Sequence, residues 1–195
     1  MYKLGITGGM GSGKSTATSY FKSKGAKIFD ADEKAKQLLI NSESIQGKII
    51  HEFGEIITSN NIIDLKKLSK YAFASKINQQ ILNDIIWPEV AKLILSASEL
   101  AKKKNTPLFI VDAALLLEAK YSHFFDSILL ITADKTIRQQ RASLRKNIPI
   151  DQIEKRMALQ LPEDEKAKIS DFIIKNNGDI AEFYRELEEF FITLP

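Results

Sequence analysis

A glycine-rich segment near the beginning of the chain has the residue types that hold nucleotide phosphates. Residues 8–15 satisfy the pattern G-x-x-x-x-G-K-[ST]. Glycines let the backbone N–H groups of such a loop turn toward a phosphate without interference from β-carbons. Lys14 would reach the β- and γ-phosphates of ATP, and the Ser15 hydroxyl would coordinate Mg²⁺. The expected nucleotide-binding residues of this loop are Gly11, Ser12, Gly13, Lys14, Ser15 and Thr16.

The alternative is a glycine-rich turn that merely joins a strand to a helix. Four glycines followed by Lys-Ser-Thr at such a junction disfavour it. The motif therefore indicates binding of a nucleoside triphosphate, and it says nothing about the phosphate acceptor.

Two aspartates, Asp30 and Asp32, follow the short apolar segment Ile28-Phe29. Ligands of open α/β sheets bind beyond the carboxyl ends of the strands. Asp32 could therefore accept the proton of an attacking hydroxyl group, or orient that group. Alternatively, Asp32 could cap the helix that begins there, a position in which aspartate is favoured. The residues alone do not decide between these roles.

A second acidic residue, Asp112, ends the apolar run Leu108-Phe109-Ile110-Val111. This is the form of a Walker B strand, whose aspartate holds Mg²⁺ in P-loop enzymes. Asp112 could bind the metal through water or contact the acceptor. A turn aspartate at the end of a strand is the plain alternative, and Glu118 is a weaker candidate in the same region.

Basic residues cluster later in the chain. Arg138, Arg141 and Arg145 have the spacing of one helix face, and Arg156 lies on the next predicted helix. Phosphoryl transfer spreads negative charge over phosphate oxygens, and the arginine fork matches that geometry. Arg141 is the preferred catalytic arginine, because its position well inside the helix would hold it rigidly. A solvated basic face is the alternative.

An alternation of short apolar runs with amphipathic segments predicts the elements that position these residues. The apolar runs predict a mainly parallel five-stranded sheet in an α/β, P-loop NTPase-type three-layer fold. The expected strands are 3–6, 27–29, 108–111, 127–131 and 171–174. The expected helices are 14–24, 32–40, 44–53, 65–75, 78–86, 88–104, 135–146, 151–161 and 179–192, with Pro88 in a first turn.

Two regions hold more helix than a simple strand–helix alternation needs. We expect a single P-loop kinase fold over residues 1–195, with its core at about 1–41, 105–133 and 169–195. The helices of about 42–104 would form a substrate-binding insertion. Residues 134–168 would form a lid, with its two helices broken at Asn147-Ile148-Pro149.

Composition excludes several classes of protein. The chain has 28 basic and 25 acidic residues, a net charge of +3 and no basic stripe interleaved with aromatics, so nucleic-acid binding is not expected. No apolar run reaches the roughly 18 residues that a membrane span needs. The absence of cysteine suits a cytoplasmic location. The sequence leaves the oligomeric state open.

Several segments together resemble the dephospho-CoA kinase family, whose members catalyse the last step of coenzyme A biosynthesis. Residues 4–16 resemble the family's opening, including Thr-Gly-Gly before the core of the loop. Asp30-Ala31-Asp32 matches its second-strand motif, and residues 112–118 resemble its D-x-P-L-L-x-E segment. The lid and tail are also similar, from Arg141 through Arg156, Gln160 and residues 173–178. The resemblance spans nearly the whole chain.

This resemblance implies that the chain uses ATP and Mg²⁺ to phosphorylate the 3′-hydroxyl of dephospho-CoA. It implies that Asp32 is the base and that Arg141 is a lid arginine in contact with phosphates. Asn176 and Gly178 match the family's loop near the adenine ring. The expected sites are therefore Asp32, Lys14 and Arg141 for catalysis, Asn176 with the phosphate loop for ATP, and Ser15 and Asp112 for the metal.

The chain departs from the family pattern at two places. Trp87-Pro88 stands where the family usually has His-Pro, and Ala114 stands where proline is usual. Neither change touches the phosphate loop or Asp32.

Other P-loop kinases of small molecules share the ATP chemistry, so a different acceptor is the first alternative. A nucleotide-gated switch without transfer activity is the second, and the missing guanine-reading N-K-x-D motif disfavours it. An inert relative is the third, and the intact loop and Asp32 argue against it.

Overall fold

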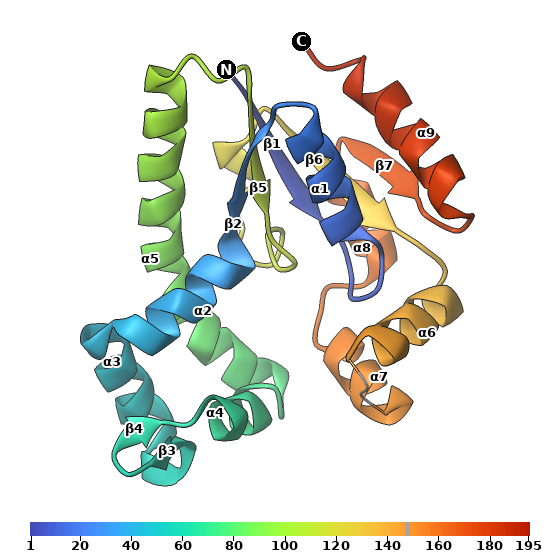
Figure 1. The fold of residues 1–195 in the computed structure, drawn as a ribbon. Coiled ribbons are helices and arrows are strands. Elements are labelled where there is room, and N and C mark those ends of the chain that lie inside the picture. The colour runs from blue at the N-terminus through green and yellow to red at the C-terminus, as the bar shows by residue number, and fades with distance from the viewer. Residues whose placement is uncertain (147–148) are drawn as a thin grey trace. The chain divides into compact units, whose positions relative to one another are not determined.

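A computed structural model describes residues 1–146 and 149–195 of the chain (Figure 1). These residues form two compact units. The first comprises Met1–Asp30 and Ala97–Pro195, and the second comprises Ala31–Ser96. The second unit overlaps the helical insertion expected at 42–104. Asn147 and Ile148, where we expected a break between the lid helices, lie outside the described residues, as does the side chain of Arg145.

A five-stranded parallel sheet forms the centre of the first unit, as predicted. Its strand order is β2-β5-β1-β6-β7, and every pairing is parallel. The central strand therefore lies between two neighbours that come later in the chain, which makes its carboxyl end a topological switch point. The strands are β1 (Tyr2–Thr7), β2 (Lys27–Asp30), β5 (Leu108–Asp112), β6 (Ser127–Thr132) and β7 (Phe172–Lys175).

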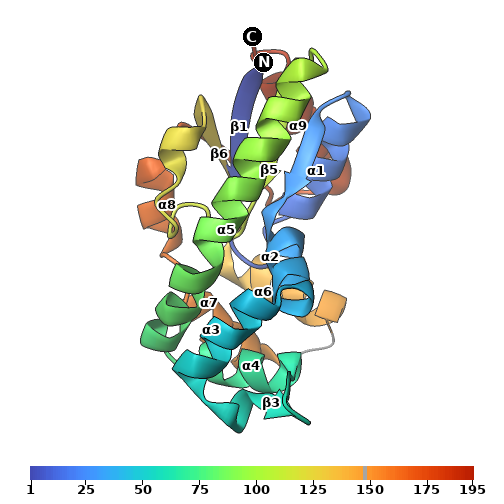
Figure 2. The ribbon, with the colours of Figure 1, turned by 90° about the vertical axis from the view of Figure 1, so that its left-hand side faces the viewer.

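Helices cover both faces of this sheet. Figures 1 and 2 show α1 (Lys14–Ser23) and α9 (Ile180–Phe191) on one face and α8 (Glu163–Ile169) on the other. The three-layer arrangement follows from the sequence, because β5 and β6 are buried almost completely and need apolar cover on both sides. The lid region contributes α6 (Lys135–Lys146) and α7 (Ile150–Ala158) to the same unit.

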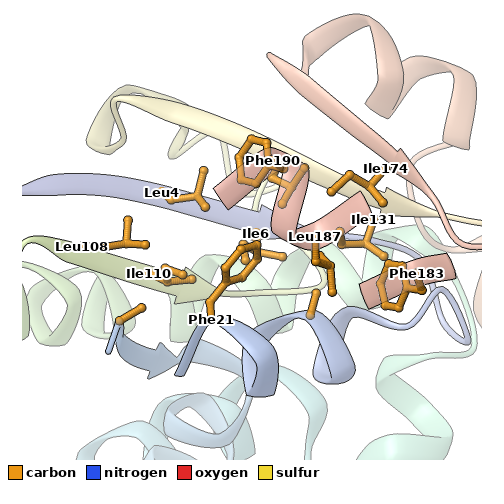
Figure 3. Packing of buried hydrophobic residues seen from close by; sticks show 13 residues of the cluster. Leu4, Ile6, Phe21, Leu108, Ile110, Ile131, Ile174, Phe183, Leu187 and Phe190 are labelled. Atoms are coloured by element: carbon orange, nitrogen blue, oxygen red, sulfur yellow. The ribbon is translucent and has the colours of Figure 1, made fainter. Parts of the chain in front are cut away.

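The main hydrophobic core lies between the sheet and the pair α1 and α9 (Figure 3). Phe21 of α1 and Leu187 of α9 are fully buried in it. Removing a buried phenylalanine side chain of this kind typically costs about 3–5 kcal/mol of stability. This packing fixes the beginning of α1, and with it the loop that precedes the helix. The strand residues of the cluster are Leu4, Ile6, Leu108, Ile110, Leu129, Ile131 and Ile174.

The second unit is mostly helical. It contains α2 (Ala31–Asn41), α3 (Glu43–Phe53), the 3₁₀ turn η1 (Glu55–Ile57), α4 (Leu65–Ala72) and residues 76–96 of α5 (Lys76–Lys103). Ser42 caps α3 by accepting from Ile45 N, and Asp64 caps α4 by accepting from two backbone N–H groups. None of the helices among the described residues combines the length and apolar character that spanning a bilayer requires.

The structure corrects three expectations about the elements. Pro88 does not begin a helix but lies inside the 28-residue α5. The buried residues Ile86 and Val90 flank it, and their packing outweighs the lost backbone hydrogen bond. The prediction missed α8, a highly charged helix, and a small hairpin of β3 (Thr58–Ser59) and β4 (Ile62–Ile63). Its turn residues, Asn60 and Asn61, have positive φ, as in hairpin turns that favour asparagine.

Candidate functional site

The phosphate loop joins the central strand to a helix, as its motif requires. It runs from the end of β1 at Thr7 to the beginning of α1 at Lys14. Gly11 and Gly13 have φ values of +81° and +102°, in the left-handed region that other residues rarely adopt. Gly13 O accepts from Thr16 N at 2.9 Å, which begins the helix. The loop therefore presents backbone N–H groups at a helix N-terminus, the usual setting for binding an anion.

Asn176 connects this loop to the end of β7. Its side-chain Nδ2 donates to Ser12 O at 2.9 Å, and the residue is buried. A β-carbon at Gly13 would overlap the Asn176 amide group, so glycine is required there for close approach as well as for its φ. The structure thus brings together two predicted nucleotide-binding residues that lie 164 positions apart in the chain.

Arg141 binds the backbone of the segment that follows β7. Its guanidinium donates to Asn176 O at 2.7 Å and to Gly178 O at 3.4 Å. These backbone contacts place Arg141 beside the predicted ATP-binding Asn176. The catalytic role of Arg141 stays a prediction.

Lys14 and Asp112 form an ion pair at the carboxyl ends of β1 and β5. Lys14 Nζ donates to Asp112 Oδ1, and both side chains are mostly buried. The sheet register places Asp30 opposite Asp112 on the neighbouring strand. The loop lysine and the Walker B aspartate, expected from separate motifs, are therefore in contact.

Ser15 and Asp112 have oxygen donors of the kind that Mg²⁺ prefers, and their metal role stays a prediction. They offer one hydroxyl and one carboxylate oxygen, and Mg²⁺ in kinases commonly takes one or two protein ligands, with substrate phosphates and water filling the rest. Among the described residues, no three His, Cys, Asp or Glu side chains gather closely enough to hold a metal by themselves. This donor set suits an ion that arrives with the nucleotide.

Arg138 is buried against the phosphate loop. Only 8% of the residue is exposed, which excludes the solvated basic face for this arginine. Its Nε donates to Ala133 O at 2.9 Å, and its NH1 donates to Glu163 Oε1 at 3.2 Å. Glu163 Oε2 accepts from Thr132 Oγ1 at 2.5 Å. The spacing of the arginines did not predict this burial, and Glu163 was not recognised from the sequence.

Glu118 belongs to a second buried ion pair near the end of β5. The Lys166 ammonium lies 3.2 Å from Glu118 Oε1 and donates to Ala114 O at 3.4 Å, and Lys166 is completely buried. Leu161 N donates to the same Glu118 oxygen at 2.9 Å. Glu118 therefore ties the segment after Asp112 to α8. Its other carboxylate oxygen, Oε2, is buried without a hydrogen-bond partner, and its candidacy for the metal or the acceptor stays a prediction.

Asp32 lies in the second unit, in the first turn of α2. The helix begins at Ala31, so Asp32 is inside the helix and does not occupy the cap position proposed as its alternative role. Its role as a base stays a prediction.

The chain resembles known proteins over nearly its whole length. A family model described as dephospho-CoA kinase matches residues 2–182. The dephospho-CoA kinase of Fusobacterium nucleatum is 36% identical over 192 residues, covering 98% of this chain and 97% of that protein. A solved structure of a Thermus thermophilus protein has a TM-score of 0.82 and 26% identity, with 100% and 98% of the two chains covered. The structure of dephospho-CoA kinase from Campylobacter jejuni has a TM-score of 0.69 and 26% identity, covering 97% and 95%.

Proposed function

Because this chain belongs to the dephospho-CoA kinase family, we propose that it transfers the γ-phosphoryl group of ATP to the 3′-hydroxyl of dephospho-CoA, giving CoA and ADP. The observation that carries this proposal is the phosphate loop between β1 and α1, with Lys14 paired to Asp112, in a chain that matches the family over nearly its whole length.

In the reaction, the 3′-oxygen of dephospho-CoA attacks the γ-phosphorus of ATP. The bond from that phosphorus to the β,γ-bridging oxygen breaks, and ADP leaves with the bonding electron pair. Asp32 takes the proton of the attacking hydroxyl. Lys14 and the loop N–H groups stabilise the negative charge on the transferring group. Arg141, in the predicted lid, also stabilises this charge.

Chain connectivity supports the assignment of Asp32. The register of the sheet aligns Asp30 with Asp112, which contacts Lys14. Asp32 follows Asp30 by two residues, so their Cα atoms can be at most about 7 Å apart. The base is thereby tethered to the strand end that holds the predicted metal ligand.

The proposed reaction uses Mg²⁺, and Ser15 and Asp112 would be the protein ligands of this ion. The ion supplies positive charge that neutralises the phosphates when bound. The helical insertion expected at about 42–104, most of which lies in the second unit, is proposed to bind the CoA portion of the acceptor. Asn176 is proposed to lie near the adenine of ATP. The cytoplasmic location expected above is part of the same proposal.

A coupled assay of ADP release tests the function. Dephospho-CoA, adenosine monophosphate, shikimate and gluconate are each supplied with ATP and Mg²⁺ at equal concentration. We expect dephospho-CoA to give the highest kcat/KM, and mass spectrometry of its product to show one added phosphoryl group. A higher kcat/KM for any other acceptor would assign the chain to another small-molecule kinase activity.

A further inference from the structure

One short segment contacts three separate parts of the candidate site. We call residues 160–166 the brace segment. Gln160 Oε1 accepts from Met10 N of the phosphate loop at 3.3 Å. Glu163 bonds to Thr132 at the end of β6 and to Arg138 of α6. The same segment ends at Lys166, whose buried ammonium bonds to the turn after β5.

The ion pair between Arg138 and Glu163 lies directly against the backbone of the phosphate loop. A β-carbon at Gly9 would overlap both the guanidinium of Arg138 and the carboxylate of Glu163. A β-carbon at Gly11 would overlap the backbone of Arg138. The pair is well shielded, with 9% of the Arg138 side chain and 24% of the Glu163 side chain exposed. It therefore forms part of the wall that supports the loop.

A loop rich in glycine has much conformational freedom, and ordering it costs entropy when phosphate binds. Contacts that hold the empty loop in its binding conformation reduce that cost. The guanidinium of Arg138 is a buried positive charge, so losing its partner would leave that charge without compensation. The guanidinium would then turn toward solvent and no longer support Gly9.

We infer that Glu163 is a positioning residue for ATP binding, which holds Arg138 against the phosphate loop and joins the loop to the lid through the brace segment. The inference rests on the proposed function only in taking the loop as the ATP site. It predicts a loss of affinity that is selective for ATP, because the proposed function assigns the loop to ATP and not to dephospho-CoA.

Glu163→Gln tests the inference, with Glu165→Gln as a matched control. Glu165 lies on the same helix, and its ion pair with Lys168 has the same 3.2 Å separation. In contrast to the Arg138–Glu163 pair, the side chains of Glu165 and Lys168 are both exposed. Calorimetric titration of Glu163→Gln should show a Kd for ATP raised about tenfold, which is the loss of one charge-assisted contact. The Kd for dephospho-CoA should change less than about twofold, and Glu165→Gln should leave both constants at the wild-type value.

Gln160→Ala is the second variant, and it tests the support of the phosphate loop by the brace segment if the Glu163 variant does not fold. It removes the acceptor of the Met10 N–H without disturbing the buried ion pair. We expect it to raise the Kd for ATP about threefold, again with little change for dephospho-CoA.

Wild-type affinity for ATP in the folded Glu163→Gln protein would overturn the inference. Equal weakening of both ligands would also overturn it, because that pattern indicates general damage to the fold. The titrations require no turnover. If the wild-type protein binds ATP but does not phosphorylate dephospho-CoA, the proposed function fails, while the effect of Glu163 on the Kd for ATP can still be measured against the Glu165→Gln control.

Discussion

At the scale of single residues, Lys14 and Asp112 prepare the phosphate loop before nucleotide binds. Their side chains are 15% and 8% exposed, so each charge is largely removed from water. A buried lysine ammonium is costly without a compensating charge, and Asp112 supplies one. ATP would bring a larger negative charge to the same ammonium. The carboxylate of Asp112 would then be available to a magnesium ion.

Lys14→Ala should lower kcat by about 10²–10³-fold, because the transition-state charge loses a fixed cation. The measurement is steady-state CoA formation at saturating ATP and dephospho-CoA. Lys22→Ala removes an exposed lysine from the last turn of the same helix and should keep the wild-type kcat. A kcat near the wild-type value in Lys14→Ala would exclude a role for this lysine in the transfer step.

Asp32→Asn should lower kcat by about 10²–10⁴-fold, the usual contribution of a general base. The Kd for ATP should stay close to the wild-type value, because the proposed triphosphate site belongs to the other unit. Glu33→Gln, in the same first turn of α2, provides the control for a lost carboxylate. Turnover of Asp32→Asn at the wild-type rate would remove Asp32 from the mechanism.

Some of these residues could be predicted from the sequence and others could not. The loop and Asp112 carry local motifs, and the structure shows Lys14 and Asp112 in contact. Glu163 carries no such motif, since its partners Thr132 and Arg138 lie 31 and 25 positions away and meet it only in the folded chain. Arg138 has the spacing of an exposed helix face, and its burial depends on the position of the phosphate loop.

At the scale of elements, a polar cluster links α1 to α9 at the edge of the core. The Tyr20 hydroxyl and the Lys24 ammonium both donate to the carboxylate of Glu188. Two hydrogen bonds lower the pKa of Glu188 below its ordinary 4.5. The bond from Lys24 has the larger effect, and the bond from Tyr20 has the next largest. Glu188 in turn raises the pKa of Lys24 above 10.5. Burial, followed by the bond to Glu188, raises the pKa of Tyr20.

These shifts predict how stability depends on pH. A glutamate whose pKa is lowered by folding stabilises the protein above its unfolded pKa, and this contribution is lost as pH falls through the lowered value. Wild type should therefore be more stable than Glu188→Gln at neutral pH. The difference should shrink as pH falls below about 4.5. Urea unfolding of both proteins between pH 7 and pH 3 measures it, and a constant difference over this range would contradict the assigned cluster.

The predicted strands agree with the structure within about two residues, because buried parallel strands appear in sequence as apolar runs between turns. Helix α8 was missed, since its seven residues are mostly charged and show no clear apolar face. Pro88 suggested a helix start by local preference, and the packing of α5 reversed that preference. Local sequence patterns were thus sufficient to predict an element where its residues are buried along its whole length.

At the scale of the whole molecule, the proposed binding residues for ATP and for CoA belong largely to different compact units. The phosphate loop, strand β5 and the described residues of the predicted lid all belong to the first unit. Asp32 and the helices proposed to bind CoA belong to the second unit. Residues 134–168, predicted to form a lid within the same fold, contact the loop through Arg138, Gln160 and Glu163.

Hydrogen exchange should separate the two ligands. ATP alone should slow exchange of backbone amides in the phosphate loop and α1, because binding stabilises the conformations that bury them. Dephospho-CoA alone should slow exchange within residues 31–96. Mass spectrometry of peptides from the two units provides the measurement. Protection by dephospho-CoA only outside residues 31–96 would contradict the proposed CoA-binding role of the second unit.

The most direct test of the central claim is a crystal structure with dephospho-CoA and a non-hydrolysable ATP analogue bound together. We predict the triphosphate within the loop of residues 8–15, in contact with Lys14. The 3′-oxygen should lie about 2.6–3.2 Å from the Asp32 carboxylate and roughly 3–3.5 Å from the γ-phosphorus. A triphosphate bound elsewhere, or a 3′-oxygen out of reach of Asp32 in the closed complex, would contradict the mechanism.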